Sequence, residues 1–322
     1  LDAASVTLNS ATSITAVAPA TLVAGTVNVT VTNSTGTSST SGTADDFAYT
    51  APVPTITGIS PVEGPTTGGT SVVITGTGFI AGATVSFGDV VIPSTSVMVT
   101  DATHLSVTAP ASIVVGPVDV TVSTTGGTSA STSFDYTIVD PTVTELDVTS
   151  GSTVGGDEVV ITGSGFVENS TVAFDALEAT VVEITPTTIT VLSPATTVVG
   201  PVDVTVTNSQ ATSAIVDGGL FTYVGATPIV ESVDPATGST VGSETVVISG
   251  TGFVDGSTVT FGELEAAVID VTPTDITVTT PATVDPGTVD VQVDNHFGVG
   301  DVPSLSVTDG TADDFEYTAP TP

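Results

Sequence analysis

The sequence contains no cysteine, no lysine and no arginine, and these absences exclude several functions. Without cysteine the chain can form neither disulfides nor thiolate metal sites. Without lysine or arginine it has no permanent cation to place on a phosphate backbone, so electrostatic binding of nucleic acid is excluded. The chain also lacks the bonds that trypsin-like proteases cleave and the lysine that a Lys–Asn isopeptide crosslink requires.

The remaining charge has one sign but is dilute. The 35 acidic residues give a net charge of −35, yet only 11% of the 322 residues are charged, against roughly 25% in an ordinary globular protein. Such a chain repels itself and stays soluble. No apolar run approaches the ~18 residues of a membrane helix, and Leu1 does not begin a signal peptide. We expect a mature, exported segment whose export signal, and any anchor, lie outside it.

Four copies of the motif Phe-x-Tyr use all 4 tyrosines of the chain. The phenylalanines are spaced by 134 − 47 = 87, 221 − 134 = 87 and 315 − 221 = 94 residues. This period predicts tandem small domains that are each closed by the same strand. A second motif, Gly-x-Gly-Phe, occurs earlier in three of the repeats. The markers of the repeat are Phe47 and Tyr49, Phe79, Phe134 and Tyr136, Phe166, Phe221 and Tyr223, Phe253, and Phe315 and Tyr317.

Each complete repeat contains about seven short segments with strand patterning, separated by turn sequences and without helical periodicity. This pattern is typical of a two-sheet Ig-like sandwich. We therefore predict an all-β fold, a tandem array of Ig-like β-sandwiches with three complete domains and an N-terminal half domain. The predicted boundaries are 1–51, 54–139, 140–225 and 228–320, with an insertion near 295–308 in the last domain that contains His296 and Phe297.

Several spaced motifs of these repeats resemble the IPT/TIG family of Ig-like domains, and the resemblance covers nearly the whole chain. They are the opening segment 54–69, the Gly-x-Gly-Phe loop, Phe87-Gly88, Ala109-Pro110-Ala111 and the run 116–122. The resemblance implies β-sandwiches of the kind found in extracellular receptors, bacterial surface proteins and some transcription factors. The DNA-binding branch of that family uses basic loops, which this chain lacks.

Residues 1–51 match only the later part of a repeat. Segments 13–20 and 27–31 and the pair Phe47/Tyr49 have counterparts in the other repeats, whereas nothing corresponds to the opening strands or to the Gly-x-Gly-Phe loop. About 50 residues bury too little surface for a stable sandwich, and open strand edges invite pairing with another chain. Two explanations stay open: the chain is a window of a longer tandem protein, or a neighbouring subunit supplies the missing strands.

No combination of residues indicates catalysis. The Gly-x-Gly-Phe loops are followed by no helix, so they lack the helix N-terminus of a phosphate site. His104 and His296 have no specified partner that would orient a catalytic base. A pair of carboxylates for glycosidic cleavage needs a cleft, which a row of slender sandwiches seldom offers. We predict a protein that is not an enzyme.

Three binding functions remain as candidates. Calcium prefers clustered oxygen ligands, and paired or junctional acids could supply them, although solvated loop acids explain the same pattern. Sequons predict N-glycosylation, although a Thr/Ser-rich chain also produces sequons by chance. Glycan binding generally uses exposed aromatics, and only Phe297 lies off the repeat pattern. The calcium candidates are Asp45, Asp46, Asp140, Asp313 and Asp314, and the sequons lie at Asn28, Asn33 and Asn169.

These features together predict a mechanical function. We expect a structural subunit of an extracellular or cell-surface filament from a prokaryote, whose main partner is another copy of itself and which needs no cofactor except, in one hypothesis, calcium. Two alternatives stay open: the stalk of a long surface adhesin, and a glycan-binding surface module.

Overall fold

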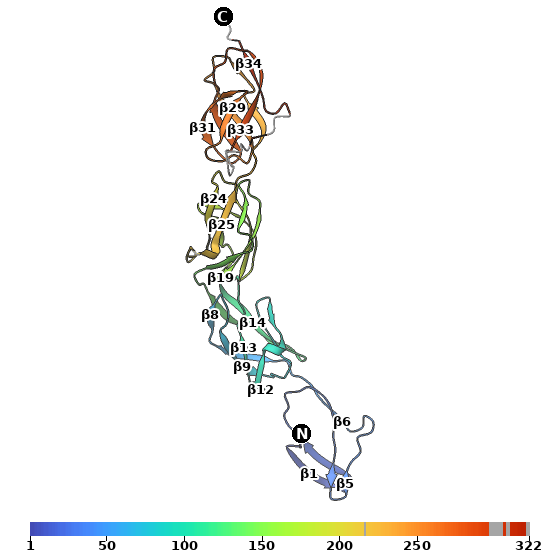
Figure 1. Ribbon diagram of the computed structural model, residues 1–322. Coiled ribbons are helices and arrows are strands. Elements are labelled where there is room, and N and C mark those ends of the chain that lie inside the picture. The colour runs from blue at the N-terminus through green and yellow to red at the C-terminus, as the bar shows by residue number, and fades with distance from the viewer. Residues whose placement is uncertain (216, 296–304, 307–309, 320–322) are drawn as a thin grey trace. The chain divides into compact units, whose positions relative to one another are not determined.

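The computed structural model describes residues 1–215, 217–295, 305–306 and 310–319. The predicted insertion near 295–308, with His296 and Phe297, lies almost entirely outside the described residues. The described parts are strands and turns with two short 3₁₀ helices, Ser94–Ser96 and Asp217–Gly219, which confirms the all-β prediction. Within these residues no helix is long and apolar enough to cross a membrane. The chain divides into two compact units, Leu1–Val139 and Asp140–Pro322, and Figure 1 labels strands of both.

The first complete sandwich lies in the unit Leu1–Val139 and consists of two sheets. One sheet has the order β12 (Met98–Asp101), β13 (His104–Thr108), β9 (Ser71–Thr77) and β7 (Thr55–Ser60). The other has the order β11 (Val90–Ile92), β10 (Thr84–Phe87), β14 (Gly116–Thr124), β16 (Thr132–Thr137) and β8 (Glu63–Pro65), with β15 (Gly127–Thr128) attached to β14. We call 54–92 the opening half of this domain and 93–137 its closing half.

The pairing pattern joins these two halves tightly. β10 of the opening half pairs antiparallel with β14 of the closing half, and β9 pairs antiparallel with β13. β8 pairs with β16, and that pair is parallel. Each sheet therefore contains strands from both halves, so neither half can close its sheets alone.

The unit Asp140–Pro322 contains two further sandwiches with the same strand order. In the second domain one sheet has the order β17 (Thr142–Leu146), β19 (Glu158–Ser164), β23 (Thr188–Leu192) and β22 (Thr180–Ile184). The other sheet has the order β18 (Ser150–Ser152), β25 (Leu220–Val224), β24 (Gly200–Thr207), β20 (Thr171–Phe174) and β21 (Leu177–Glu178). In the third domain one sheet has the order β26 (Ile229–Asp234), β28 (Thr245–Thr251), β32 (Asp275–Thr279) and β31 (Ala267–Val271). The other sheet has the order β27 (Thr237–Ser239), β34 (Asp314–Thr318), β33 (Gly287–Asp294), β29 (Thr258–Phe261) and β30 (Leu264–Glu265).

Alternation of apolar residues along each strand builds the cores. In β9, Val72 and Ile74 are 0% exposed, whereas Val73 between them is 43% exposed, because successive strand side chains point to opposite faces. In the core of the first domain these residues meet Phe87 from the second sheet. Each complete domain has one such cluster drawn from both of its sheets, which confirms the prediction of tandem Ig-like sandwiches.

The Phe-x-Tyr motif lies at the centre of each core. In the first domain Phe134 and Tyr136 are buried, and Phe87 of the opening half contacts Phe134 edge-on, with ring centroids 5.3 Å apart. The hydroxyl of Tyr136 donates a hydrogen bond of 2.7 Å to the carbonyl of Pro110. The same edge-on contact recurs between Phe174 and Phe221 at 5.1 Å and between Phe261 and Phe315 at 5.0 Å, and the same hydroxyl bond between Tyr223 and Pro194 and between Tyr317 and Pro281.

The Gly-x-Gly-Phe loops combine two close approaches. At Gly76 a Cβ would meet the backbone carbonyl of Thr55 in the opening strand and lie 2.7 Å from Cζ of Phe79. Gly78 has φ +74°, and a Cβ there would lie 3.1 Å from Pro52 in the preceding linker. The loop is therefore a structural turn that leads into a core phenylalanine, and it also packs against the preceding linker. Gly163 with Gly165 and Gly250 with Gly252 repeat this arrangement.

Burial of the tyrosines predicts a pH limit for the fold. Loss of hydration raises the pKa of Tyr136 from 10.0 to about 12. Burial and then the carboxylate of Asp157 raise the pKa of Tyr223, and burial and then that of Glu244 raise the pKa of Tyr317. The neutral phenols therefore stabilise the fold fully below pH 10, and this contribution is lost as the pH rises through the folded pKa.

We expect tyrosinate absorbance to show at least one group that ionises near pH 12 while the protein is folded, and earlier ionisation after unfolding. Tyr136→Phe should remove that step and lower the free energy of unfolding of the first domain by about 1 kcal/mol, because the Pro110 carbonyl loses its donor. Titration of all four tyrosines near pH 10 in the folded protein would contradict the packing described.

Candidate functional site

Residues 1–51 adopt the strand pairing of a closing half. β3 (Gly25–Asn28) pairs antiparallel with β6 (Asp46–Tyr49), with Gly25 opposite Tyr49 and Val27 opposite Phe47. β14 and β16 of the first domain have the same register, with Gly116 opposite Tyr136 and Val118 opposite Phe134. The hydroxyl of Tyr49 donates to the carbonyl of Pro19 at 3.0 Å, as the other tyrosines do to their prolines. The remaining pairs are β1 (Ser5–Ser10) with β2 (Ser13–Val17) and β4 (Thr32–Asn33) with β5 (Gly36–Thr37) (Figure 1).

The apolar side chains of this closing half are uncovered. Phe47 is 42% exposed, whereas Phe134, Phe221 and Phe315 at the same position are 0% exposed. Val29 and Val31 are 49% and 47% exposed, against 0% for their counterparts Val120 and Val122 in β14. Ile14 is 41% exposed, against 0% for its counterpart Leu105. We call Ile14, Val29, Val31 and Phe47 the open face.

The cause of this exposure is the lack of strands from an opening half. Within residues 1–51, all of which the structure describes, no strand corresponds to β8, β9 or β10. The ring of Phe47 still contacts Tyr49 edge-on, with centroids 5.0 Å apart, but it has no counterpart of the Phe87 contact. Residues 1–51 therefore present exposed apolar side chains beside unpaired strand edges.

The predicted calcium ligands are not brought together by the described residues. Asp313 is buried, Asp46 and Asp140 are exposed, and Oδ1 of Asp140 accepts a hydrogen bond from Gln210 at 3.1 Å. Among the described residues no group of three or more His, Asp or Glu side chains could hold a metal ion. Calcium binding stays a prediction, and a melting temperature that falls in excess chelator would support it.

The three sequon asparagines are all exposed, and two of them have a local structural role. Asn169 adopts φ +64°, where Gly82 and Gly256 of the other domains have φ +88° and +87°. Asparagine is one of the few residues besides glycine that tolerates this conformation. Oδ1 of Asn33 accepts the backbone N–H of Thr35 at 2.8 Å. Glycosylation at Asn28, Asn33 and Asn169 stays a prediction, which an intact mass tests.

His104 forms only a local cluster. Nδ1 of His104 lies 3.2 Å from Oδ1 of Asp101 and 2.9 Å from the hydroxyl of Thr103. The Thr103 hydroxyl and backbone N–H also donate to Asp101, at 2.6 and 2.7 Å. All three groups lie on the surface at the β12–β13 turn, so the geometry is that of a capped hairpin turn.

This turn carries a second pH prediction. The hydroxyl of Thr103, followed by its backbone N–H, lowers the pKa of Asp101 from 3.8 to about 2. Ionised Asp101 therefore favours the folded turn above pH 3.8, and that contribution is lost as the pH falls through about 2. We expect a carboxylate midpoint near 2 by NMR and a rise toward 3.8 in Thr103→Val. An unchanged midpoint in this variant would contradict the assigned cause.

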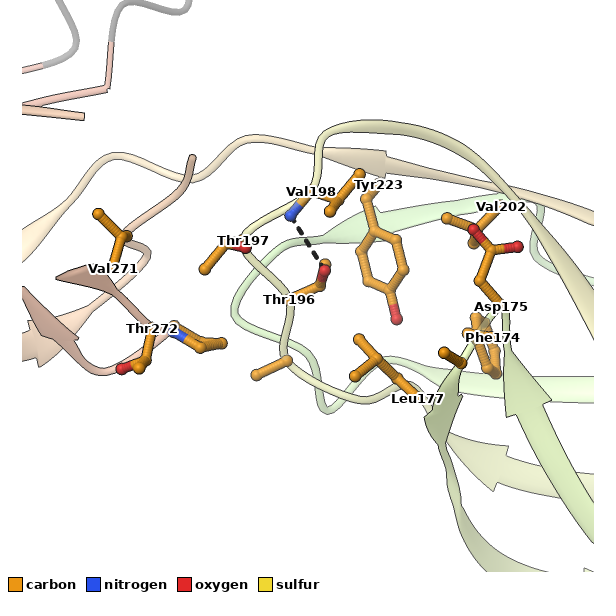
Figure 2. Close-up of a pocket in the computed structure, with 13 residues that line it drawn as sticks. Phe174, Asp175, Leu177, Thr196, Thr197, Val198, Val202, Tyr223, Val271 and Thr272 are labelled. Atoms are coloured by element: carbon orange, nitrogen blue, oxygen red, sulfur yellow. Dashed lines mark hydrogen bonds between the residues drawn. The ribbon is translucent and has the colours of Figure 1, made fainter. Parts of the chain in front are cut away.

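A cavity of about 400 Å³ lies within the unit Asp140–Pro322, where the second and third domains meet. Figure 2 shows Val271 and Thr272 facing Thr196, Thr197 and Val198, with the Val198 amide bonded to the Thr196 hydroxyl. The carbonyl of Thr197 also accepts the N–H of Asp255 at 2.9 Å. This cavity has no signal in the sequence, because its walls come from segments about 75 residues apart that only the fold brings together.

The hydrogen bond between Asp255 and Thr197 has a counterpart in the unit Leu1–Val139. There the carbonyl of Leu22 accepts the N–H of Ala81 at 2.8 Å. Leu22 lies three residues after Pro19, and Thr197 lies three residues after Pro194; these are the prolines whose carbonyls accept the tyrosine hydroxyls. Ala81 and Asp255 each lie two residues after the phenylalanine of a Gly-x-Gly-Phe loop. A backbone hydrogen bond of one kind therefore joins successive repeats within each unit.

Comparison with known proteins supports the fold assignment. The sequence model of the IPT/TIG domain matches residues 54–137, 141–223 and 228–308. No protein with a curated function matches the chain in sequence.

Solved structures with a similar fold include the plexin A4 extracellular region (20% identity, 83% of this chain and 24% of that chain, TM-score 0.29). Others are the protein SGBP-B from a xyloglucan utilization locus of Bacteroides uniformis (18%, 75% and 66%, 0.27) and Drosophila OTK extracellular domains 3–5 (11%, 84% and 100%, 0.29). The chain spans only 24% and 35% of the two plexin chains.

Proposed function

Because the chain belongs to the IPT/TIG domain family, we propose that it is a structural, non-catalytic protein of the cell exterior. In this proposal its domains form the repeating body of a filament, and the open face of residues 1–51 is the assembly site. The observation that carries the proposal is the exposure of Phe47, at 42%, beside three closed domains in which the same residue is fully buried. Exposed apolar faces of this kind often mark sites of interaction with another polypeptide segment.

Contacts at the domain borders support a load-bearing role. The amide of Asn295 donates to the carbonyls of Gly252 and Ala226, at 2.6 and 2.9 Å, and so ties the third domain to the linker before it. In the first domain the Thr124 hydroxyl donates to the carbonyl of Pro52 in the linker at 3.4 Å. These bonds and the backbone hydrogen bonds between successive repeats restrict movement at the domain borders, which suits a chain under tension.

Composition supports the same proposal. The chain offers trypsin-like proteases no Lys or Arg, and it has no cysteine that reducing conditions could affect. A net charge of −35 over 322 residues makes copies of the chain repel one another. Contact between copies is therefore favoured only where apolar faces meet. Assembly should therefore be favoured by salt, which screens the repulsion between copies.

Electron microscopy of the purified protein tests the proposal. We expect regular fibres with a repeat of about three domains, more abundant at higher ionic strength. Phe47→Asp should abolish them, and Val284→Asp, at a third-domain side chain that is 92% exposed, should not. Dispersed single molecules under all conditions would favour the stalk of an adhesin instead, and specific retention on a glycan array would favour a glycan-binding module.

A further inference from the structure

We infer that the cavity where the second and third domains meet binds a small organic cation, namely an ammonium group attached to an apolar body. The inference goes beyond the proposed function and does not depend on whether the chain assembles. It is carried by Asp175, the one charged side chain among the residues that line the cavity, which stands where the other two complete domains have a glycine.

The second domain supplies an apolar floor and rim for the cavity, whose volume of about 400 Å³ suits a small ligand. The floor consists of core side chains that are at most 5% exposed, so the sandwich fixes its shape; they are Phe174, Val202 and Tyr223. Leu177 and Val198 at the rim are 40% and 49% exposed. A ligand that covers these two side chains removes apolar surface from water, which favours binding.

The third domain closes the opposite side of the cavity with Val271, Thr272 and Pro273, at the turn between β31 and β32. Figure 2 shows the first two of these residues facing Thr197 of the second domain. The carbonyl of Thr197 accepts the N–H of Asp255 at 2.9 Å, and this bond holds the third domain beside the loop. Two domains of one unit therefore bound the cavity.

Asp175 occupies a backbone position for which the repeat otherwise uses glycine. It has φ +50°, and its counterparts Gly88 and Gly262 have φ +56° and +61°. Glycine adopts this left-handed conformation without a steric penalty, whereas a residue with a side chain adopts it with strain. The turn therefore does not need an aspartate, and strain that is retained at the wall of a cavity indicates a functional role.

The carboxylate of Asp175 is held in place by one oxygen and leaves the other available. Oδ1 accepts the backbone N–H of Asp203 at 2.9 Å, and no donor among the described residues is bonded to Oδ2. The chain has no Lys or Arg to neutralise this charge, so a second copy of the chain cannot supply such a side chain either. The cation therefore comes from a ligand. The apolar walls lower the local dielectric constant and so strengthen the attraction.

The composition of the walls decides which cation fits. A calcium ion takes about six to eight oxygen ligands, whereas the walls offer one carboxylate beside mainly apolar side chains. An anion is repelled by Asp175 and by the net charge of −35. An organic ammonium group pairs with Asp175 while its apolar part covers Leu177 and Val198. The ligand class is therefore an amine with a small hydrocarbon body.

Binding of three probes to the full chain tests the inference, because the probes share one hydrocarbon body and differ in charge. They are phenethylammonium, 2-phenylethanol and 3-phenylpropanoate, each followed at low ionic strength by NMR of the methyl groups of Leu177, Val198 and Thr272. We expect saturable shifts with the ammonium probe, a Kd about tenfold higher or more with the alcohol, and no shifts with the carboxylate. An ammonium probe that shifts none of these methyl groups, or that binds no more tightly than the alcohol, would overturn the inference.

Two variants that each remove one charge separate the Asp175 carboxylate from the net charge of the chain. Asp175→Gly installs the residue that the other two domains have at this turn, so it should fold. It should weaken binding of the ammonium probe to the level of the alcohol and leave the alcohol unchanged. Glu178→Gln alters an exposed side chain outside the cavity lining and should leave both affinities unchanged. Equal losses in the two variants, or no loss in Asp175→Gly, would contradict the assigned site.

Discussion

Replacing Phe221 by alanine is expected to lower the free energy of unfolding of the second domain by about 3–5 kcal/mol, the usual effect of removing a buried aromatic ring. The side chain is 0% exposed, and its ring contacts those of Phe174 and Tyr223 at centroid distances of 5.1 Å each. The void would open at the centre of the sandwich, where strands of both sheets prevent collapse. Hydrogen exchange against denaturant concentration, resolved by domain, measures the change.

Phe47→Ala is the matched control, because Phe47 occupies the same repeat position in a half without cover. Its ring is 42% exposed, so the isolated chain should lose about 1 kcal/mol or less. Equal losses at both positions in the isolated chain would contradict the open face, since they would mean that Phe47 is already buried.

Replacing Gly76 by alanine should destabilise the first domain by about 1–3 kcal/mol, with the upper end expected because the obstacle is backbone. The added methyl would meet the carbonyl of Thr55 and lie 2.7 Å from Cζ of Phe79. β7 would have to move away from β9, and the core phenylalanine would lose its position. Thermal unfolding followed by calorimetry should show a lower transition for the first domain while the others keep theirs.

Gly58→Ala provides the control within the same strand pair. Gly58 lies in β7, and a Cβ there meets nothing within 4 Å. We expect a change within about 0.5 kcal/mol, as for other unobstructed positions. A similar loss in both variants would show that the strand pair tolerates no side chain at all, and that the close approach at Gly76 is not the cause.

Much of the fold could be predicted from the sequence because its signals are local and repeated. Alternation along 71–75 and 118–122 marks strands, and the recurrence of Phe-x-Tyr marks a domain period, so tandem Ig-like sandwiches followed without knowledge of any contact. The role of the Gly-x-Gly-Phe loop was only half visible. Its phenylalanine could be assigned to the core, but the close packing of Gly78 against Pro52 joins two positions about 26 residues apart.

The candidate site was less accessible to sequence reasoning. Pairs such as Asp45/Asp46 and Asp313/Asp314 suggested calcium, yet the described residues bring no three acidic or histidine side chains together. Two adjacent carboxylates do not make a calcium site, because the ion takes about six to eight oxygen ligands. Asn169 resembles a glycan acceptor by its motif, whereas its φ of +64° shows a backbone conformation that also favours an asparagine or a glycine there.

The sequence by itself determined that four closing strands accompany three sets of opening strands, that the fold is all-β, and that no cation is available to bind a phosphate backbone. Only the tertiary structure decided that residues 1–51 keep the pairing of a closing half, with Gly25 opposite Tyr49, while Phe47 stays 42% exposed. The reason is physical: the alternation that marks a strand lies in consecutive residues, whereas burial of a side chain depends on which strands, distant in sequence, cover its face of the sheet. For Phe47, those strands are the ones that the described residues do not supply.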